Sequence, residues 1–592
     1  MCGIFCVVNK HSNDAAQTIR QGLKRLEYRG YDSWGIAVQT DNKIDLIKYV
    51  GEIDKTADNI KKLPKSTTGI GHTRWATTGA VTKINAHPHF STDHSFVLAQ
   101  NGIVENYEEL KKDLIKKKYR FISQTDTEVI TRLIEEELTK KNDLFSAVRQ
   151  AFLQLKGRNT IIILTKTGRV IAARNGSPLV IGVNIKQKEI YLSSDSLSFA
   201  PFVTKTIFVN NGQLVDCENA QLVITDIATG KKIRPRLENI NIINYRVDKG
   251  GYAHYMLKEI HESPYVINQL LKQSPDQYEK LAAAIKKARH VYTIGSGTAG
   301  IAAGQTAFYF RTHAQINATS LVGADAREYF DLIGKNDLII APSQSGETAD
   351  VLEVLEYLKK KGAAIATFVN MPGAMMTRLA DYAFMSESGP EICVLSTKVF
   401  VSQIDWGYLV AKVTAGKTRQ AKENLRHLSD QISQYLEKNK TKVQELAKYL
   451  LNAHDIFLMS KYENFQIVRE GMIKLVEATY KHAHAIPAGD LKHYAITLME
   501  PGVPVIVVSS NDKVKSDILN TVYEVKARGA QVIGISPEFD KNFDFHLKVP
   551  DTGETSAIMN IVPLQLLAYY IALMLGNSID KPRNIAKSVT VK

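Results

Sequence analysis

Cysteine is scarce in this chain, with only four among 592 residues, at positions 2, 6, 217 and 393. So few thiols exclude a disulfide framework, and their spacing matches no metal-binding motif. Chains without disulfides are typical of reducing compartments. We therefore expect a cytoplasmic protein that holds no metal.

Long hydrophobic runs are also missing. The most apolar stretch, residues 561–575, is shorter than the roughly 18 residues that a membrane-spanning helix needs, and it contains Pro563 and Gln565. No basic segment precedes the apolar run at the N-terminus, so this run does not resemble a signal peptide. We expect residues 561–575 to form a buried helix, and we expect no membrane association.

Extremes of composition are absent as well. Apolar residues make up 44% of the chain and charged residues 23%, which excludes disordered, collagen-like and long coiled-coil proteins. The formal net charge of +14 suits an anionic partner: a phosphorylated metabolite, a nucleic acid or a membrane surface. Charge alone does not choose between these partners. At roughly 150 residues per domain, the length predicts three or four domains.

The first 240 residues alternate short β-patterns with turns. The predicted elements are strands at 44–50, 95–102, 159–165 and 179–183 and amphipathic helices at 15–26 and 126–139. Strands with inserted helices are typical of a layered α+β domain. We expect this domain at residues 1–240, with a polar linker at 241–254.

The rest of the chain contains an internal repeat. The matching segments are 290–297 with 454–461, 336–347 with 502–513, and 362–370 with 529–537. The offset between them stays near about 165 residues. In each half an apolar strand ends in a polar turn and a helix follows, which is βαβ patterning. We expect two doubly wound parallel α/β domains, at 255–430 and 431–577, and a C-terminal tail at 578–592.

The N-terminus and one strand end suggest a nucleophilic site. Removal of Met1 would leave Cys2 with both a thiol and a free α-amine, whose pKa near ~7.7 makes it a usable base. Asn101 and Gly102 end a predicted strand. A side-chain amide and a glycine N–H are the kind of donors that form an oxyanion hole.

Two further residues complete this pattern. Arg74 could bind a carboxylate through two parallel hydrogen bonds, and Asp126 could bind an ammonium group. A carboxylate, an ammonium group and an amide carbonyl are the three groups of glutamine. Taken singly, each feature has a plainer interpretation: a buried cysteine, a salt bridge at Arg74, a hairpin turn at 101–102 and a helix cap at Asp126.

Residues 343–348 follow a predicted strand and open a predicted helix. Their hydroxyl groups would lie beside the free N–H groups of the helix start, which is a typical phosphate-binding arrangement. These hydroxyls belong to Ser343, Ser345 and Thr348. The alternative is a serine-capped helix that binds nothing. The corresponding loop of the second half, 509–512, lacks this hydroxyl pattern, so we expect one such phosphate site per chain.

The segment 469–493 carries acid–base candidates. Glu470, Lys474 and Glu477 recur at the spacing of one helix face. A carboxylate beside a lysine could transfer a proton on a bound substrate. A solvated charged stripe would show the same spacing, so the pattern alone leaves both interpretations open.

Six motifs together point to a known family. They are CGI at 2–4, LEYRGYDS at 26–33, HTRWAT at 72–77, NAHPH at 85–89, NGIVEN at 101–106 and TDTE at 125–128. This set resembles the class II glutamine amidotransferases, and in particular the glutamine–fructose-6-phosphate aminotransferase family. The repeated halves resemble that family's two sugar isomerase (SIS) domains, so the resemblance covers the whole chain. It implies an α+β N-terminal-nucleophile glutaminase, layered αββα, followed by two doubly wound parallel α/β SIS domains.

The resemblance implies roles for the matching residues of the glutaminase. Cys2 would attack the amide of glutamine and form a γ-glutamyl thioester, with Asn101 and Gly102 as the oxyanion hole. Trp75 would gate the path of the released ammonia. Glutamine would be held by Arg74, Trp75, Thr77 and Asp126.

In the SIS half, the resemblance makes Glu477 the acid and base of enolisation, Lys474 its cationic partner and His493 the ring-opening residue. Lys587, in the tail motif PRNIAKSVTV at 582–591, would form a Schiff base with the ketose. No pyridoxal phosphate or other cofactor is implied. The sugar phosphate would be bound by Thr298, Ser343, Gln344, Ser345, Thr348 and Ser396.

The implied reaction converts fructose 6-phosphate and L-glutamine into glucosamine 6-phosphate and glutamate, with ammonia transferred inside the protein. We expect a homodimer and no nucleic-acid partner. The chain departs from the family pattern at Thr78, Ala299, residues 459–461, Tyr494, Ala495 and Lys592. These departures leave open another phosphorylated keto-sugar as substrate. A sugar-phosphate-binding regulator is a further alternative, which the presence of Cys2, Glu477 and Lys587 together disfavours.

Overall fold

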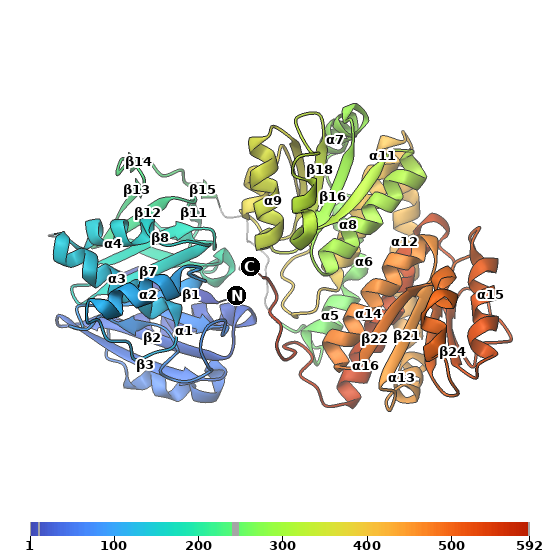
Figure 1. Cartoon of the computed structure of the whole chain (residues 1–592), viewed down its shortest axis with the longest axis horizontal. Helices are drawn as coiled ribbons and strands as arrows, with labels where there is room; N and C mark the ends of the chain where they lie inside the picture. Colours follow the sequence, from blue (N-terminus) through green and yellow to red (C-terminus); the bar gives the residue numbers. More distant parts are fainter. Residues whose placement is uncertain (1, 10–11, 142, 240–247, 590–592) are drawn as a thin grey trace. The chain divides into compact units, whose positions relative to one another are not determined.

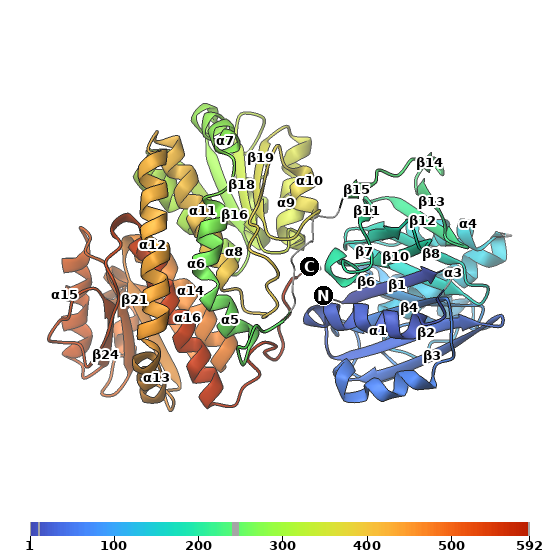
Figure 2. The ribbon, with the colours of Figure 1, turned by 180° about the vertical axis from the view of Figure 1, so that it is seen from behind.

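The computed structural model describes residues 2–9, 12–141, 143–239 and 248–589. The chain forms two compact units, shown in Figures 1 and 2. The first is Met1–Arg246 together with Ala586–Lys592, and the second is Val247–Ile585. Each unit is described by itself below.

The first unit contains two antiparallel sheets. The strand order of the first sheet is β15 (Glu238–Asn239), β11 (Lys205–Phe208), β9 (Val180–Asn184), β10 (Glu189–Ser193), β1 (Gly3–Asn9), β4 (Thr68–Arg74), β2 (Ser33–Thr40) and β3 (Lys43–Val50). The order of the second sheet is β14 (Lys232–Ile233), β13 (Gln221–Asp226), β12 (Gln213–Glu218), β8 (Val170–Asn175), β7 (Asn159–Thr165), β6 (Phe96–Gly102) and β5 (His89–Phe90).

Helices cover the outer faces of both sheets, so the order of layers is αββα. The period of two along a strand sends Ile4 and Val8 of β1 into the core between the sheets, while Phe5 packs beneath α1. The helices of this unit are α1 (Ala15–Leu26), α2 (Tyr107–Lys116), α3 (Asp126–Lys140) and α4 (Leu144–Leu153). The last three cover the second sheet. The predicted layered α+β fold is confirmed.

The second unit contains two parallel sheets with matching strand orders. The first order is β17 (Ala318–Val322), β16 (Val291–Gly295), β18 (Leu338–Ser343), β19 (Ala364–Val369) and β20 (Tyr382–Met385). The second order is β22 (His482–Pro487), β21 (Asp455–Ser460), β23 (Pro504–Val508), β24 (Gln531–Ser536) and β25 (Phe545–Lys548). Both sheets are parallel throughout these strands. The sequence repeat is therefore a repeat of two doubly wound α/β domains.

Helices surround both parallel sheets, and the two halves share one continuous apolar core. The helices are α5 (Tyr255–His261), α6 (Ser263–Leu270), α7 (Pro275–Lys287), α8 (Thr298–Tyr309), α9 (Ala349–Lys360), α10 (Met375–Leu379), α11 (Lys398–Thr414), α12 (Thr418–Lys438), α13 (Lys440–Tyr449), α14 (Phe465–Thr479), α15 (Lys515–Lys526) and α16 (Ser556–Met574). Short helices are η1 (Glu27–Arg29), η2 (Ile53–Lys62), η3 (Ser196–Ser198), η4 (Phe310–Ala314), η5 (Gly323–Tyr329), η6 (Tyr462–Asn464), η7 (Ala488–His493), η8 (Ala495–Leu498) and η9 (Gly553–Thr555).

Helix α16 is apolar on every side because other elements surround it. It packs against α13 and α14, which Figure 2 shows beside it. Among the described residues, the segment Gly553–Met574 alone is long and apolar enough to cross a membrane, and 89% of its most apolar window is buried inside the fold. The predicted buried helix is confirmed over residues 561–572, whereas Leu573, Met574 and Leu575 are exposed and α16 ends at Met574.

The predicted elements agree with the observed ones to within a few residues. Helix α1 spans the predicted range, and α3 extends the second predicted helix by one residue. The predicted linker at 241–254 lies partly outside the described residues, and so does the end of the tail at 578–592. The domain boundaries stay predictions.

Candidate glutaminase and sugar-phosphate sites

Cys2 lies immediately before β1, next to the end of β4. The backbone N–H of Trp75 points at its Sγ atom over 3.3 Å, and Sγ lies 3.5 Å from the Trp75 carbonyl oxygen. Burial raises the pKa of the Cys2 thiol, while the Trp75 N–H and the nearby Arg74 charge lower it. The resting thiol therefore needs a base before it can act as a nucleophile. Met1 lies outside the described residues.

Asn101 and Gly102 lie at the end of β6, beside Cys2. The Asn101 Nδ2 donates to the Cys2 carbonyl oxygen over 3.1 Å, and an amide NH₂ has a second hydrogen to offer. Gly102 has φ +126°, and a Cβ there would lie 2.0 Å from the Arg158 carbonyl oxygen. Both residues pair with β7. The interpretation as a hairpin turn is therefore wrong, and the glycine is required by the backbone.

The Arg74 guanidinium is buried and shapes the loop that follows β4. It donates to the carbonyl oxygens of Thr78, Gly79 and Ala80, the latter two over 3.3 and 3.2 Å. Within the described part of the chain no ion pair forms at Arg74, so the plainer salt-bridge interpretation is not supported. Thr77 is exposed in this loop. The carboxylate-binding role of Arg74 stays a prediction.

Asp126 is the first residue of α3, but another residue caps this helix. The cap is Thr125, whose side chain accepts from the Glu128 N–H. The Asp126 Oδ2 accepts from the Val104 N–H over 2.8 Å and from the Gln100 Nε2 over 3.4 Å. Burial raises the pKa of Asp126, and the Val104 N–H opposes that shift. The helix-cap interpretation of Asp126 is wrong, and its role in binding an ammonium group stays a prediction.

Sequence reasoning assigned no role to the buried network of the 26–33 motif. Arg29 pairs with Asp195 over 2.7 Å, next to the Tyr28 hydroxyl. The Asp32 carboxylate accepts from the Ala76 N–H over 2.8 Å. Tyr31 packs edge-on against Trp75, with 5.6 Å between ring centroids. The motif thus holds the loop that carries Trp75. The available signal in the sequence was the motif itself, which matches the family pattern.

The predicted phosphate loop lies between β18 and α9. The Ser343 hydroxyl oxygen accepts from the Gly346 N–H over 2.9 Å, and the Ser345 hydroxyl oxygen accepts from the Glu347 N–H over 3.2 Å. Thr348 stands at the helix start but makes no side-chain cap bond. The serine-capped interpretation therefore does not describe this helix start. A Cβ on Gly346 would lie 2.5 Å from the Ala374 Cβ.

Helix α14 brings the acid–base candidates together with the start of α8. The Thr298 hydroxyl, at the start of α8, donates to the Glu470 carboxylate over 3.0 Å. Lys474 lies 3.3 Å from Glu470 and 2.7 Å from Glu477. The side chains of Glu470 and Lys474 have 0% exposure, so the solvated-stripe interpretation is wrong for them.

Burial and charge pairing set the protonation of this group. Burial is the main cause that raises the pKa of Glu470 to about 7. Burial alone would lower the pKa of Lys474, but the carboxylates of Glu477 and Glu470 raise it above its usual range. A carboxyl group poised near neutral pH beside a fixed cation is suited to proton transfer.

The second half has a corresponding region at the ends of β21 and β23, but protein side chains fill it. The Ser510 hydroxyl accepts from Asn464 over 2.8 Å and from Asn560 over 3.2 Å. Gln305 and Tyr309 on α8 stand one repeat length, about 165 residues, before Glu470 and Lys474. An amide and a phenol replace the charged pair there, which supports the prediction of one sugar site per chain.

The other predicted residues are not joined to this group by described contacts. His493 is exposed, and within the described residues no hydrogen bond or ion pair links it to Lys474 or Glu477. Ser396 donates to Glu391 over 2.9 Å at the start of α11. Gln344 and Lys587 are partly buried. The ligand roles of these residues stay predictions.

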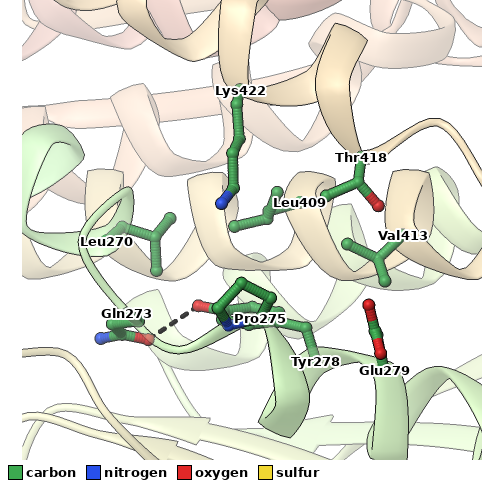
Figure 3. Close-up of a pocket in the computed structure, with 9 residues that line it drawn as sticks. All are labelled: Leu270, Gln273, Pro275, Tyr278, Glu279, Leu409, Val413, Thr418 and Lys422. Carbon is green, nitrogen blue, oxygen red and sulfur yellow. Dashed lines mark hydrogen bonds between the residues drawn. The ribbon is translucent and has the colours of Figure 1, made fainter.

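A separate pocket lies between α6, α7, α11 and α12 (Figure 3). Its lining is largely apolar, with Leu270, Leu409 and Val413 facing the space, and the Tyr278 hydroxyl donates to Gln273 over 2.7 Å. This lining does not match the clustered hydroxyl and charged groups that a sugar phosphate requires.

The comparisons with known proteins agree with both halves of the structure. A glutamine amidotransferase domain matches residues 72–200, and an SIS domain matches residues 284–412 and again 449–575. The chain is 37% identical over 607 residues to a glutamine–fructose-6-phosphate aminotransferase (isomerizing) of Thermococcus kodakarensis, and 36% identical over 613 residues to one of Thermus thermophilus. Both alignments cover 100% of each chain.

Solved structures match the second unit. The C-terminal domain of a glucosamine-fructose-6-phosphate aminotransferase from Francisella tularensis is 28% identical, with a TM-score of 0.53, and covers 57% of this chain and 100% of its own. The fold and the site thus define a glutamine amidotransferase domain joined to two SIS domains. The chain belongs to the family of isomerizing glutamine–fructose-6-phosphate aminotransferases.

Proposed function

We propose that this chain transfers the amide nitrogen of L-glutamine to fructose 6-phosphate and isomerises the product to glucosamine 6-phosphate. Full-length relatives at 36–37% identity carry the name of this activity. The single structural observation that carries the proposal is the Glu470–Lys474–Glu477 group, whose Glu470 is bonded to Thr298. Thr298 is itself a predicted sugar-phosphate ligand, and a proton-transfer group beside such a ligand serves isomerisation.

In the glutaminase, the Cys2 thiol loses its proton to a base, for which its own α-amine is the candidate once Met1 is removed. The thiolate attacks the amide carbon of glutamine. Asn101 and Gly102 donate to the oxyanion that forms. The protonated α-amine then returns its proton to the amide nitrogen, the C–N bond breaks, and ammonia leaves. Water then hydrolyses the γ-glutamyl thioester to glutamate, while Arg74 and Asp126 hold the carboxylate and ammonium ends of the substrate.

In the SIS half, the hydroxyls of Ser343, Ser345 and Thr348 bind the phosphate of the sugar. Lys587 forms an imine at C2 of the open-chain ketose, and ammonia replaces it. Glu477 then removes a proton from C1 and returns it to C2, which yields the 2-amino aldose. Lys474, held by both carboxylates, stabilises the negative charge on Glu477.

The deciding experiment is product analysis of the purified protein with glutamine and a panel of ketose phosphates. We expect glucosamine 6-phosphate from fructose 6-phosphate, in equal amount to glutamate. The residues that depart from the family pattern near the sugar site, such as Ala299, favour a test of other ketose phosphates in the same panel. If the protein aminates only another ketose phosphate, that sugar is its substrate. If it binds a sugar phosphate but aminates none, the protein is a sugar-phosphate-binding regulator.

We further propose that the protein is a cytoplasmic homodimer. None of the four cysteines forms a disulfide in the described part of the chain, and three of them are buried, which supports a reducing compartment. Sedimentation of the purified chain measures its oligomeric state directly. A monomer at micromolar concentration would contradict the dimer.

A further inference from the structure

His72 lies in β4 with 0% exposure, directly behind the proposed oxyanion donor. Its Nε2 atom lies 2.9 Å from the Gln100 carbonyl oxygen and 3.2 Å from the Asn101 Oδ1. The period of two along β4 places His72 on the same face as Arg74.

These contacts determine which nitrogen of His72 carries the proton. A carbonyl oxygen and an amide oxygen only accept hydrogen bonds. Nε2 must therefore be the protonated nitrogen, and Nδ1 the bare one. Consistent with this tautomer, the buried Nδ1 has no hydrogen-bond partner within the described residues.

The same contacts fix the orientation of the Asn101 amide. Its Oδ1 faces the His72 donor, while its Nδ2 donates to the carbonyl oxygen of Cys2 over 3.1 Å. If the amide turned by 180°, Nδ2–H would meet the Nε2–H of His72, and an oxygen would face the carbonyl of Cys2. Both new contacts would be repulsive, so His72 selects one of the two orientations.

His72 stays neutral throughout the working pH range. Burial lowers the pKa of His72 to about 3, and the Arg74 charge adds to this effect. The ring also packs against His87, with 4.3 Å between centroids, and burial lowers the pKa of His87 as well. A neutral ring keeps the Nε2–H donor and adds no charge beside the developing oxyanion.

We propose that His72 is a positioning residue of the glutaminase, whose Nε2–H holds the Asn101 amide with Nδ2 towards Cys2. The oxyanion donor is then set before glutamine binds, which is the preorganisation that makes such donors effective. This inference rests on the proposed function of Cys2 and Asn101.

The test is a double-mutant cycle that measures glutamine hydrolysis. We expect His72→Leu to lower kcat by about ten- to a hundredfold and to change KM little, because the loss falls on the transition state. We expect Asn101→Ala to lower kcat by about a hundred- to a thousandfold. In the Asn101→Ala background, His72→Leu should add less than about twofold, because its effect acts through Asn101.

His72→Gln is the conservative variant, since its side-chain amide also offers an N–H donor, and it should recover most of the lost kcat. Circular dichroism and thermal unfolding of the same preparations serve as the folding control. If His72→Leu does not fold, His72→Asn, whose amide is too short to reach Asn101, replaces it in the cycle.

Equal losses from His72→Leu in both backgrounds, or a rise in KM without a loss in kcat, would overturn the positioning role. Failure of the proposed function has a different signature: Cys2→Ala would still hydrolyse glutamine, or Asn101→Ala would hydrolyse it at the normal rate.

Discussion

At the scale of single residues, the proposed nucleophile of the glutaminase is the thiol of Cys2. The thiol of Cys2 contacts the Trp75 backbone and lies beside Asn101, all within the first unit. The proposed sugar-phosphate loop, residues 343–348, belongs to the second unit. Changes at the two sites should therefore affect different reactions.

Replacement of Cys2 by Ala should abolish glutamine hydrolysis, because no other group near Asn101 can form the thioester. Synthesis with added ammonium salt should remain, since it bypasses the thiol. Glutamate release and glucosamine 6-phosphate formation, measured in parallel, check both halves. Undiminished glutamine turnover in this variant would remove Cys2 from the mechanism.

Replacement of Ser345 or Thr348 by Ala should raise the KM for the sugar phosphate. A hydrogen bond to a charged group contributes roughly 1.5–3 kcal/mol, which corresponds to about ten- to a hundredfold. Glutaminase activity in the absence of sugar should barely change. Normal sugar affinity in both variants would place the phosphate elsewhere.

At the scale of elements, α14 and α11 both carry ionisable side chains inside the core. In α14 the buried carboxylate of Glu470 is paired with Lys474 and bonded to Thr298. In α11, by contrast, neither carboxyl oxygen of the fully buried Asp405 has a hydrogen-bond partner among the described residues. Burial raises the pKa of Asp405 well above its usual range. An unpaired buried carboxyl group destabilises a fold.

The Asp405→Asn variant should be more stable than the parent, and the difference should grow with pH. The folded parent keeps a proton on Asp405 that the unfolded chain releases above about pH 4. Its stability therefore falls as pH rises towards the folded pKa, by up to about 1.4 kcal/mol per pH unit.

Thermal unfolding at a series of pH values measures this effect. We expect the variant's Tm to exceed that of the parent by a few degrees at pH 8, with a smaller gap at pH 5. A gap that stays constant or shrinks as pH rises would show that Asp405 is ionised in the fold.

At the scale of the whole molecule, we expect glutamine-dependent synthesis to require the C-terminal tail as well as both domain types. Lys587 is proposed to form an imine with the ketose, so borohydride and fructose 6-phosphate should trap an adduct on the C-terminal peptide. Lys587→Arg keeps the positive charge but cannot form an imine. It should lose synthesis and keep Cys2-dependent glutaminase.

Peptide mass analysis and parallel activity assays check this expectation. Deletion of residues 583–592 should have the same consequence as Lys587→Arg. A truncated chain that makes glucosamine 6-phosphate at the normal rate would remove Lys587 from the mechanism. A regulator that only binds sugar phosphate would give no adduct and would tolerate both changes.

Much of the fold was predictable because its signals are local in sequence. The β-patterns at 95–102 and 159–165 and the apolar runs of the repeat depend only on neighbouring residues, and they indicate the layered first domain and the two parallel sheets. Short motifs likewise place Asn101 at a strand end and Asp126 at a helix start. The sequence by itself thus determined the order of domains and the chemistry available at their edges.

The tertiary structure decided which charged groups are buried and which polar groups meet. Glu470, Lys474 and Glu477 lie on one face of a helix, and their spacing in the sequence is the same whether solvent or protein covers that face. Only packing places Glu470 against Thr298, which is 172 residues distant along the chain. The contact of His72 with Asn101 likewise depends on which strands and sheets lie together. Contacts between distant segments follow from burial and register, and neither is encoded in a local pattern.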